Sequence, residues 1–320
     1  VGDVGGEYNG VKSGQNLKET RSSAELIAEA VKLAKESDFV VFVGGLNKSD
    51  RQDAEGMDRK SYGLPYNQDQ LISELSKANK NLAVVLISGN AVAMPWVKDV
   101  PSVLQSWYLG SEAGHAIAGV LAGDVNPSGK LPFSFPVKLE DNGAHAMGEY
   151  PGNKEELAAG KGKDLKDPIN ITYNEGIFVG YRWQDMKNIK PLFSFGHGLS
   201  YTTFEYGKVK ADKSELTSND KITFTVSVKN TGKVDGAEVV QLYVSDLKSS
   251  LPRPLKELKG FDKVYLKAGE SKDVSITIDK SALSFFDPVK HDWVAEPGDF
   301  EALVGSSSSD IRTKIKFTLN

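Results

Sequence analysis

Several common kinds of functional site are excluded by what this sequence of 320 residues lacks. It contains no cysteine, which rules out disulfides, thiolate metal ligands and a cysteine nucleophile. Its four histidines are scattered, so a multi-histidine metal site is not expected. No apolar run approaches the ~18 residues that cross a bilayer, and the net charge of −4 comes with no basic patch. We therefore expect no membrane span and no nucleic-acid partner.

The sequence also lacks an initiator methionine, and it begins VGDVGGEYNGVKSG, without a basic region or an apolar core. Such a start is not a signal peptide. It is typical of a loop within a domain, and we expect the chain to be a piece of a longer protein. Charged residues make up 26% and hydrophobic residues 39%, a globular composition with room for two domains.

Strands and helices alternate in the first third of the predicted structure. Ser22 to Ser37 reads as a helix, with Ser22 and Glu25 as a capping box. The unbroken apolar run Phe39–Val43 predicts a strand buried on both faces, as in a parallel sheet. A second helix is expected from Pro65, and further elements follow as strands at Leu82–Ile87 and Val103–Tyr108 and a helix at Ser111–Ala122. This alternation favours a doubly wound α/β layer.

The second half follows a different pattern. Residues 137–168 lose any periodicity and are expected to form a long surface excursion. Structure resumes with a predicted strand at Ile177–Trp183 and an aromatic, glycine-rich junction at Phe193–Tyr206. Period-two alternation then marks strands at Ile222–Lys229, Val239–Val244 and Val274–Ile278. Because no cysteine pair accompanies them, a β-sandwich of fibronectin type III kind is favoured.

The segment Asp50–Pro65, DRQDAEGMDRKSYGLP, is the strongest candidate for chemistry. It connects a predicted buried strand to a helix, which is where open α/β sheets place their functional residues. Glu55 is the candidate acid, with Asp53 and Asp58 near enough to perturb its pKa and with Arg51 and Arg59 to neutralise them. A solvated, salt-bridged loop would have the same composition, and spacing alone does not decide between the two.

Other motifs give weaker indications. Gly44-Gly45 invites a nucleotide site, but no GxGxxG or P-loop pattern follows, and no GxSxG elbow supports a serine hydrolase. His115 and His197 are expected to be surface, packing or turn residues. Trp96 and Trp107 could stack on a sugar, although core packing is the favoured reading. Glu175 could be a second acid or could make a structural hydrogen bond.

The motif EGMDR with Leu64-Pro65 and Gln68 resembles the EGxDR…LPxxQ motif of glycoside hydrolase family 3 β-glucosidases. The likeness continues through Trp107, Gly110 and Glu112-Ala113-Gly114. It extends over Gly123–Pro136, Tyr173–Trp183 and Pro191–Tyr206, and the β-rich part resembles that family's fibronectin-like domain. One departure is LGSEAG at Leu109–Gly114, where the family often has PGQEGG.

The resemblance implies a fold in two parts. A three-layer α/β sandwich with a mostly parallel sheet, lacking its first strand, would span residues 1–136. An irregular wrapping segment with a return strand would span 137–206, and a fibronectin type III-like sandwich 207–320.

The resemblance also implies a two-step retaining hydrolysis that releases terminal β-D-glucosyl residues from oligosaccharides. Glu55 would be the general acid/base, and Asp53, Asp58 and Arg59 would support its loop, Asp58 and Arg59 by pairing. The nucleophilic aspartate would belong to an N-terminal barrel domain of the same protein that this chain lacks. The chain alone is therefore expected to be inactive.

Several expectations about partners follow from the same resemblance. The substrate would be a β-linked oligosaccharide or glucoside, no metal or organic cofactor would be required, and a homodimer is left open. The location would be periplasmic or secreted. The alternatives are a β-xylosidase or another exo-glycosidase of the family, or a non-catalytic carbohydrate-binding or adhesion module.

Overall fold

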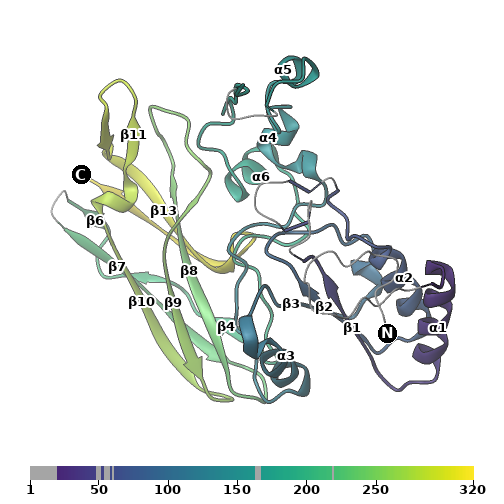
Figure 1. Ribbon diagram of the computed structural model, residues 1–320. Coiled ribbons are helices and arrows are strands. Elements are labelled where there is room, and N and C mark those ends of the chain that lie inside the picture. The colour runs from purple at the N-terminus through teal and green to yellow at the C-terminus, as the bar shows by residue number, and fades with distance from the viewer. Residues whose placement is uncertain (1–19, 48–51, 54–57, 60, 163–166, 218–219) are drawn as a thin grey trace. The chain divides into compact units, whose positions relative to one another are not determined.

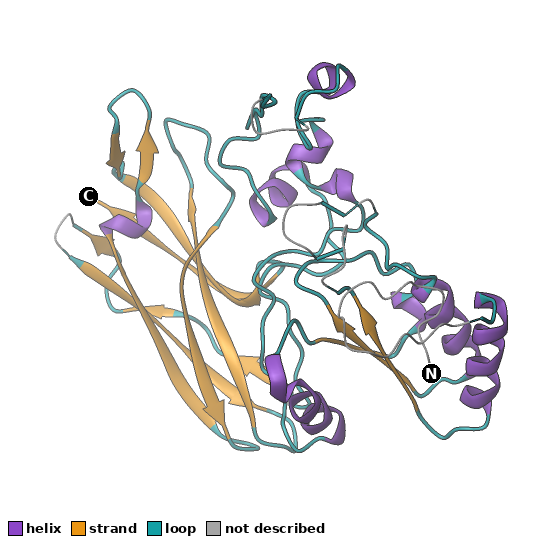
Figure 2. Ribbon diagram, viewed as in Figure 1, coloured by secondary structure: helices purple, strands orange, loops and turns teal. Residues whose placement is uncertain are grey.

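The structure is a computed structural model that describes residues 20–47, 52–53, 58–59, 61–162, 167–217 and 220–320. The chain divides into two compact units, residues 1–121 and 122–320. Figure 1 labels most of the elements of both, and Figure 2 colours helices and strands separately. The described α-helices precede residue 190, and the long strands follow it. The predicted division into three domains stays a prediction.

The first unit is a mixed α/β region built on a small parallel sheet. Its elements in chain order are α1 (Ser23–Lys35), β1 (Val40–Gly45), α2 (Gln68–Ala78), β2 (Leu82–Ile87), β3 (Ser102–Gln105) and α3 (Ala113–Ala122). The strands pair in parallel in the order β1-β2-β3, with Val40 opposite Leu82 and Val84 opposite Val103. Parallel pairing and the helix-strand alternation were both predicted from the sequence.

Helices α1 and α2 pack together and supply one side of the core of this unit. The predicted capping box of α1 is present, because the Ser22 hydroxyl accepts from Glu25 N and the Glu25 carboxylate accepts from Ser22 N. The apolar face of α2 buries Leu71, Ile72 and Leu75 as predicted. Leu82, Val84 and Leu86 of β2 are also fully buried.

Two predictions for this unit are wrong. Among the described residues β1 is an edge strand, and one of its faces is open, with Val41 51% and Val43 56% exposed, so it is not buried on both faces. A groove of about 760 Å³ runs along this strand and α1, lined by residues that include Leu33, Val41, Gly44 and Gln68. Helix α2 begins at Gln68 and not at Pro65, because Tyr66 and Asn67 adopt positive φ values that no helix accepts.

The second unit begins with a segment of short helices that precedes the sandwich. These are α4 (Gly143–Ala146), α5 (Lys154–Ala158) and α6 (Tyr181–Lys187). The strand predicted at Ile177–Trp183 is therefore wrong, since its second half is helical. Gly180, with a φ of +62°, precedes the helix, and α6 then buries Trp183 and Gln184.

The remainder of the second unit is a two-sheet β-sandwich. One sheet has the order β10-β7-β4 with β5 also on β7, the other has the order β6-β14-β13-β8-β9, and β11 pairs with β12 as a hairpin. The strands are β4 (Phe204–Tyr206), β5 (Lys210–Ala211), β6 (Glu215–Leu216), β7 (Lys221–Asn230), β8 (Gly236–Asp246), β9 (Glu257–Leu266), β10 (Ser271–Asp279), β11 (Phe285–Asp287), β12 (Asp292–Val294), β13 (Gly298–Ser307) and β14 (Asp310–Leu319).

The core of the sandwich comes from alternate residues of facing strands. Ile222, Phe224, Val226 and Val228 of β7 point inward, as the predicted period of two requires. They meet apolar residues of the other sheet, including Val240 and Leu242 of β8, Phe300 of β13 and Phe317 of β14. The predicted strands at Ile222–Lys229, Val239–Val244 and Val274–Ile278 are confirmed as the inner parts of β7, β8 and β10.

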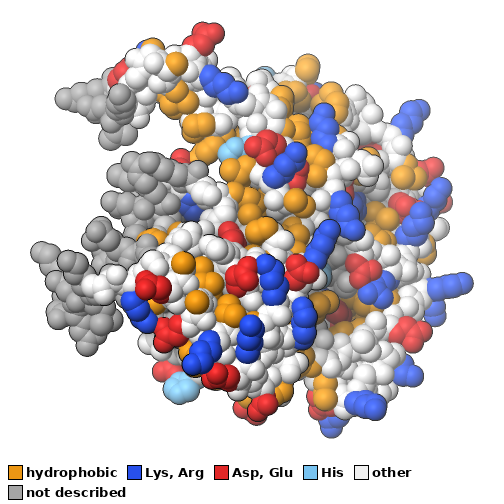
Figure 3. Space-filling model, turned by 90° about the vertical axis from the view of Figure 1, so that its right-hand side faces the viewer, with side chains coloured by type: hydrophobic (Ala, Val, Ile, Leu, Met, Phe, Trp, Pro, Cys, Tyr) orange, Lys and Arg blue, Asp and Glu red, His pale blue; other side chains and the backbone are white. Residues whose placement is uncertain are grey.

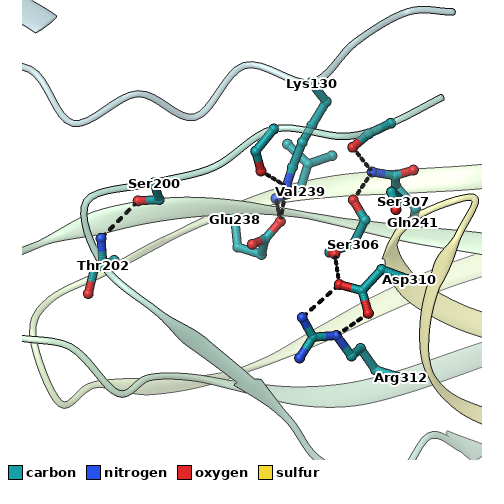
Figure 4. Close-up of polar contacts among 12 residues, drawn as sticks. Lys130, Ser200, Thr202, Glu238, Val239, Gln241, Ser306, Ser307, Asp310 and Arg312 are labelled. Atoms are coloured by element: carbon teal, nitrogen blue, oxygen red, sulfur yellow. Dashed lines mark hydrogen bonds and ion pairs between the residues drawn. The ribbon is translucent and has the colours of Figure 1, made fainter. Parts of the chain in front are cut away.

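A polar cluster joins the predicted junction Phe193–Tyr206 to β8 and β13 (Figure 4). The Lys130 ammonium lies 2.9 Å from the Glu238 carboxylate and donates to Gly198 O at 3.0 Å. The Gln241 amide donates to the carbonyls of Gly196 and Ser306. The junction is therefore packed, as predicted, and it is fastened to the sheet by polar contacts as well as by aromatic ones.

The exposed surface carries charges of both signs. Figure 3 shows acidic and basic side chains interspersed on the face that it draws, with apolar side chains between them. Among the described residues, no helix combines the length and the apolar composition that crossing a membrane requires.

Candidate functional site

The carboxyl ends of the three parallel strands meet at one edge of the sheet, and the candidate site is built there. Leu46 N donates to Ile87 O at 2.8 Å, and Ser106 N donates to Leu86 O at 2.9 Å. The residues that follow β1, β2 and β3 therefore lie side by side. Parallel sheets gather ligand-contacting loops at this edge.

Gly45 ends β1 and is fixed there by Gln68, the glutamine of the LPxxQ motif. The Gln68 amide accepts from Gly45 N at 2.7 Å and donates to Gly45 O at 2.9 Å, which imitates one step of strand pairing on the open side of β1. Gly45 has a φ of +135°, and a Cβ there would lie 2.1 Å from Ile87 O. The glycine pair and the glutamine thus have a structural explanation that needs no nucleotide.

Asp53 ties the start of the candidate segment to the ends of β2 and β3. Its Oδ2 accepts from Gly89 N at 2.7 Å and from the Tyr108 hydroxyl at 2.7 Å. Burial of the phenol, and then the bond to Asp53 and its charge, raise the pKa of Tyr108. The phenol therefore keeps its proton near neutral pH and can donate it to Asp53.

Gln52 adds a second attachment beside Asp53. This buried side chain accepts from Asn47 N at 3.0 Å and donates to the Tyr66 hydroxyl at 2.6 Å. Asp53 N also donates to Asn47 O at 3.1 Å. The backbone at residues 52–53 is consequently held against both the end of β1 and the turn that precedes α2.

Arg59 makes the attachment at the other end of the segment. Its Nη2 donates to Ala91 O at 2.7 Å, and its guanidinium carbon lies 6.0 Å from the centre of the Tyr62 ring. Its Nη1 is buried and has no hydrogen-bond partner among the described residues. A buried guanidinium nitrogen in this state is suited to a carboxylate or a hydroxyl group.

The predicted site residues fall into three groups. Asp53 and Arg59 are brought to the carboxyl edge of the sheet, while Asp58 is exposed. Within the described ranges no ion pair joins Asp58 to Arg59. Glu55, the predicted acid, and Arg51 lie outside the described residues, so the role of Glu55 stays a prediction.

Asp69 and Trp96 are hydrogen-bonded to each other next to the turn that leads into α2. The buried Trp96 donates through its indole nitrogen to Asp69 Oδ1 at 2.7 Å, and Leu64 N donates to Asp69 Oδ2 at 3.1 Å. Burial raises the pKa of Asp69, and the two hydrogen bonds oppose that rise. Trp96 is thus a core residue, which confirms the predicted core packing, and it does not form a platform for a sugar.

The remaining candidates lie apart from this edge. The His115 side chain is 91% exposed and pairs with Glu112 at 2.6 Å, and His197 stacks on Phe193 with ring centres 5.3 Å apart. Burial lowers the pKa of His197, with a further contribution from Lys130. Glu175 precedes no strand, and its Oε2 is buried without a hydrogen-bond partner among the described residues. Within those residues no cluster of His, Asp and Glu is arranged to hold a metal ion.

Tyr108 and Gln52 were missed as functional candidates. Tyr108 was assigned to the third strand, but β3 ends at Gln105 and Tyr108 lies beyond it at the carboxyl edge. A prediction that ended the third strand at Gln105 would have placed Tyr108 at the carboxyl edge, beside the residues that follow β1 and β2. No sequence pattern indicated that Gln52 is buried, because a glutamine in a charged loop is ordinarily exposed.

Two family models match the chain. The model described as the glycosyl hydrolase family 3 C-terminal domain matches residues 4–181, and the model described as the fibronectin type III-like domain matches residues 238–308. The first model includes the whole of the candidate site. The second matches the part of the chain that folds as the sandwich.

Individual relatives of the chain are named β-glucosidases. The chain is 54% identical over 291 residues to the β-glucosidase BoGH3A of Bacteroides ovatus, and 45% identical over 307 residues to the thermostable β-glucosidase B of Acetivibrio thermocellus. These matches cover 90% and 96% of the chain. They span 37% and 38% of the length of the two relatives.

Solved structures match along nearly the whole chain. A β-glucosidase from Kluyveromyces marxianus in complex with glucose superposes with a TM-score of 0.84 at 39% identity. DesR, a β-glucosidase from Streptomyces venezuelae in complex with D-glucose, gives 0.83 at 39% identity. The matches cover 95% and 93% of this chain and 34% and 36% of those chains.

Proposed function

Since the chain belongs to the glycosyl hydrolase family 3 C-terminal domain family, we propose that it is the C-terminal part of a retaining, exo-acting β-glucosidase. Its contribution would be the general acid/base Glu55. The observation that carries the proposal is that Asp53 and Arg59, on either side of Glu55 in the sequence, are both hydrogen-bonded at the carboxyl edge of the parallel sheet. A loop that interacts only with solvent would not make these hydrogen bonds to the chain that follows β2.

The proposed reaction has two steps. Glu55 first donates its proton to the departing glycosidic oxygen while an aspartate attacks the anomeric carbon and forms a glycosyl-enzyme. The Glu55 carboxylate then accepts a proton from water, and that water releases the sugar and regenerates the aspartate. The aspartate is expected on an N-terminal barrel domain of the same protein.

The proposed substrate follows from the relatives. BoGH3A and the Acetivibrio enzyme are named β-glucosidases, and two of the matching structures contain glucose. We accordingly expect terminal β-D-glucosyl residues of oligosaccharides as substrates of the whole protein. A periplasmic or secreted location remains our expectation.

The finer architecture of the first unit also belongs to this proposal. Helices α1 and α2 cover one face of the sheet, whereas Val41 and Val43 leave part of the other face open. Helix α3 consists largely of small and apolar residues, yet none of them is buried. We propose that a second helical layer completes a three-layer α/β sandwich in the whole protein.

Replacement of Glu55 by glutamine in the full-length protein tests the assignment. General acid-base catalysis contributes roughly 10²–10⁴-fold, so kcat/KM for alkyl or nitrophenyl β-glucosides should fall by about that factor. The loss should be smaller for dinitrophenyl β-glucoside, whose leaving group needs no proton. Azide should restore turnover by attacking the glycosyl-enzyme in place of water.

The matched control is Glu74→Gln, which removes an exposed carboxylate on α2 that pairs with Lys77. This variant should retain the activity of the parent protein. If Glu55→Gln were to hydrolyse every substrate as fast as the parent, the acid/base assignment would be refuted. A non-catalytic sugar-binding or adhesion role for this chain would then be favoured.

A further inference from the structure

One oxygen atom joins the ends of two strands to the segment that carries Glu55. Asp53 Oδ2 accepts both Gly89 N, which follows β2, and the Tyr108 hydroxyl, which follows β3. Asp53 precedes Glu55 by two residues. We propose that the Tyr108 hydroxyl, acting through Asp53, is a positioning residue for the catalytic carboxyl of Glu55. The inference rests on the function proposed above.

One of the two donors to Asp53, the amide of Gly89, lies in a turn that is hydrogen-bonded internally and to the end of β3. The Ser88 hydroxyl donates to Asn90 O at 2.8 Å and so fixes the turn that contains Gly89. Gln105, the last residue of β3, donates from its Nε2 to Ser88 O and to Ser88 Oγ at 3.1 Å each. The ends of β2 and β3 are therefore hydrogen-bonded to each other, and Asp53 accepts one hydrogen bond from a residue that follows each strand.

The chemistry of the contact suits a permanent attachment. A carboxylate that accepts from a phenol and a backbone amide makes charge-assisted hydrogen bonds, which are shorter and about twice as strong as neutral ones. Tyr108 is 47% exposed, so its ring covers one side of the contact and its other side faces solvent. A Cβ at Gly89 would lie 3.1 Å from the Tyr108 ring, which shows how closely the ring packs on that turn.

The attachment has a counterpart on the far side of Glu55. Arg59 donates to Ala91 O, one residue after the turn that holds Gly89, so both ends of the segment are tied to the same stretch of chain after β2. A proton donor has to lie within hydrogen-bond reach of the leaving oxygen, and a misplacement of 1 Å can cost ~10²-fold. Loss of the Tyr108 hydroxyl should therefore impair proton donation more than it impairs folding.

The test compares Tyr108→Phe with the parent in the full-length protein, using aryl β-glucosides whose leaving groups differ in pKa. The loss in kcat/KM should be about 10-fold or more for the poorest leaving groups and should shrink as the leaving group improves. Tyr265→Phe, on the exposed side of β9, is the matched control and should behave as the parent.

Asp53 provides the conservative and the disruptive variants. Asp53→Asn keeps an oxygen that can accept from Gly89 N and Tyr108, so it should retain most of the activity, whereas Asp53→Ala should lose at least as much as Tyr108→Phe. Because the two residues act through one bond, the double variant Tyr108→Phe/Asp53→Ala should be no worse than Asp53→Ala alone.

The outcomes separate this inference from the proposed function. An equal loss for Tyr108→Phe on all leaving groups, or additive losses in the double variant, would overturn the positioning role. If Glu55→Gln, measured alongside, showed no dependence on the leaving group, the acid/base assignment itself would fail. A dependence for Glu55→Gln without one for Tyr108→Phe would contradict only the inference drawn here.

Discussion

At the scale of single residues, the ion pair of Lys130 and Glu238 is a nearly buried contact in the second unit (Figure 4). The side chains are only 13% and 9% exposed. Lys130 belongs to the segment before the short helices, and Glu238 belongs to β8. The pair therefore holds that segment on the sheet, and each charge depends on the other because water reaches neither freely.

Lys130→Met should destabilise the protein by about 3 kcal/mol, near the low end of the cost of leaving one buried charge unpaired. Glu238 would keep the hydrogen bond from Val239 N, at 2.8 Å, but would lose the cation paired with it. Urea unfolding followed by tryptophan fluorescence measures the change. Lys314→Met removes the ion pair with Glu301, in which the lysine is 63% exposed, and should cost less than ~1 kcal/mol. Equal effects of the two variants would contradict the argument.

Residue-level predictions succeeded where the signal was local. The Ser22–Glu25 cap needs only four consecutive residues, and burial of Trp96 follows from its size and its apolar neighbours. The contact between Asp53 and Tyr108 joins positions 55 residues apart. No spacing rule reports which loop residues meet across a sheet edge, so the sequence did not reveal that pair.

At the scale of elements, strand periodicity in the sandwich was predicted well and the boundaries in the α/β part less well. Alternation in β7 and β10 is a strong signal because one face of each strand is buried and the other is wet. β1 is equally apolar on both faces, but whether a face is covered depends on neighbours distant in sequence. The segment Ile177–Trp183 predicts a strand, but period and composition do not distinguish a strand of this length from a short helix.

The junction Phe193–Tyr206 gives a pH prediction through His197. Burial, and then Lys130, lower the folded-state pKa of this imidazole, while Asp310 opposes the change. The unfolded chain therefore binds a proton more readily than the folded chain. The stability that the neutral imidazole contributes is full above a pH of about 6.5 and is lost progressively as the pH falls below it.

His197→Gln should consequently weaken the dependence of unfolding free energy on pH between about 7.5 and 5.5. The measurement is the urea midpoint at several pH values in that interval. His115→Gln, on the exposed surface of α3, is the matched control and should leave the slope as it is in the parent. An unchanged slope in His197→Gln would show that this histidine is not the group responsible.

At the scale of the whole molecule, the chain spans little more than a third of the curated relatives it matches. Retaining hydrolysis needs two carboxyl groups about 5–5.5 Å apart. The sequence predicts Glu55 as one of them and identifies no nucleophile, since a structural hydrogen bond is the favoured interpretation of Glu175. The sequence motifs nevertheless predicted the family and the order in which its C-terminal domain and its fibronectin type III-like domain follow one another.

The chain by itself should therefore hydrolyse no nitrophenyl β-glucoside above background. Joined to the barrel domain proposed for the same protein, it should gain activity that Glu55→Gln abolishes for poor leaving groups. A purified preparation of these 320 residues that turned over the substrate efficiently would contradict the division of labour between acid/base and nucleophile.

The place of β14 in its sheet has a consequence for how the sandwich is made. β14 lies between β13 and β6, and its pairing with β6 joins Thr318 to Glu215 across about a hundred residues of chain. Until the ribosome has released residues up to 319, Phe224 and Phe300 lack Phe317, the ring that both contact in the finished core. Such distant pairing slows folding, so the nascent sandwich would present this unfinished surface to chaperones throughout its synthesis.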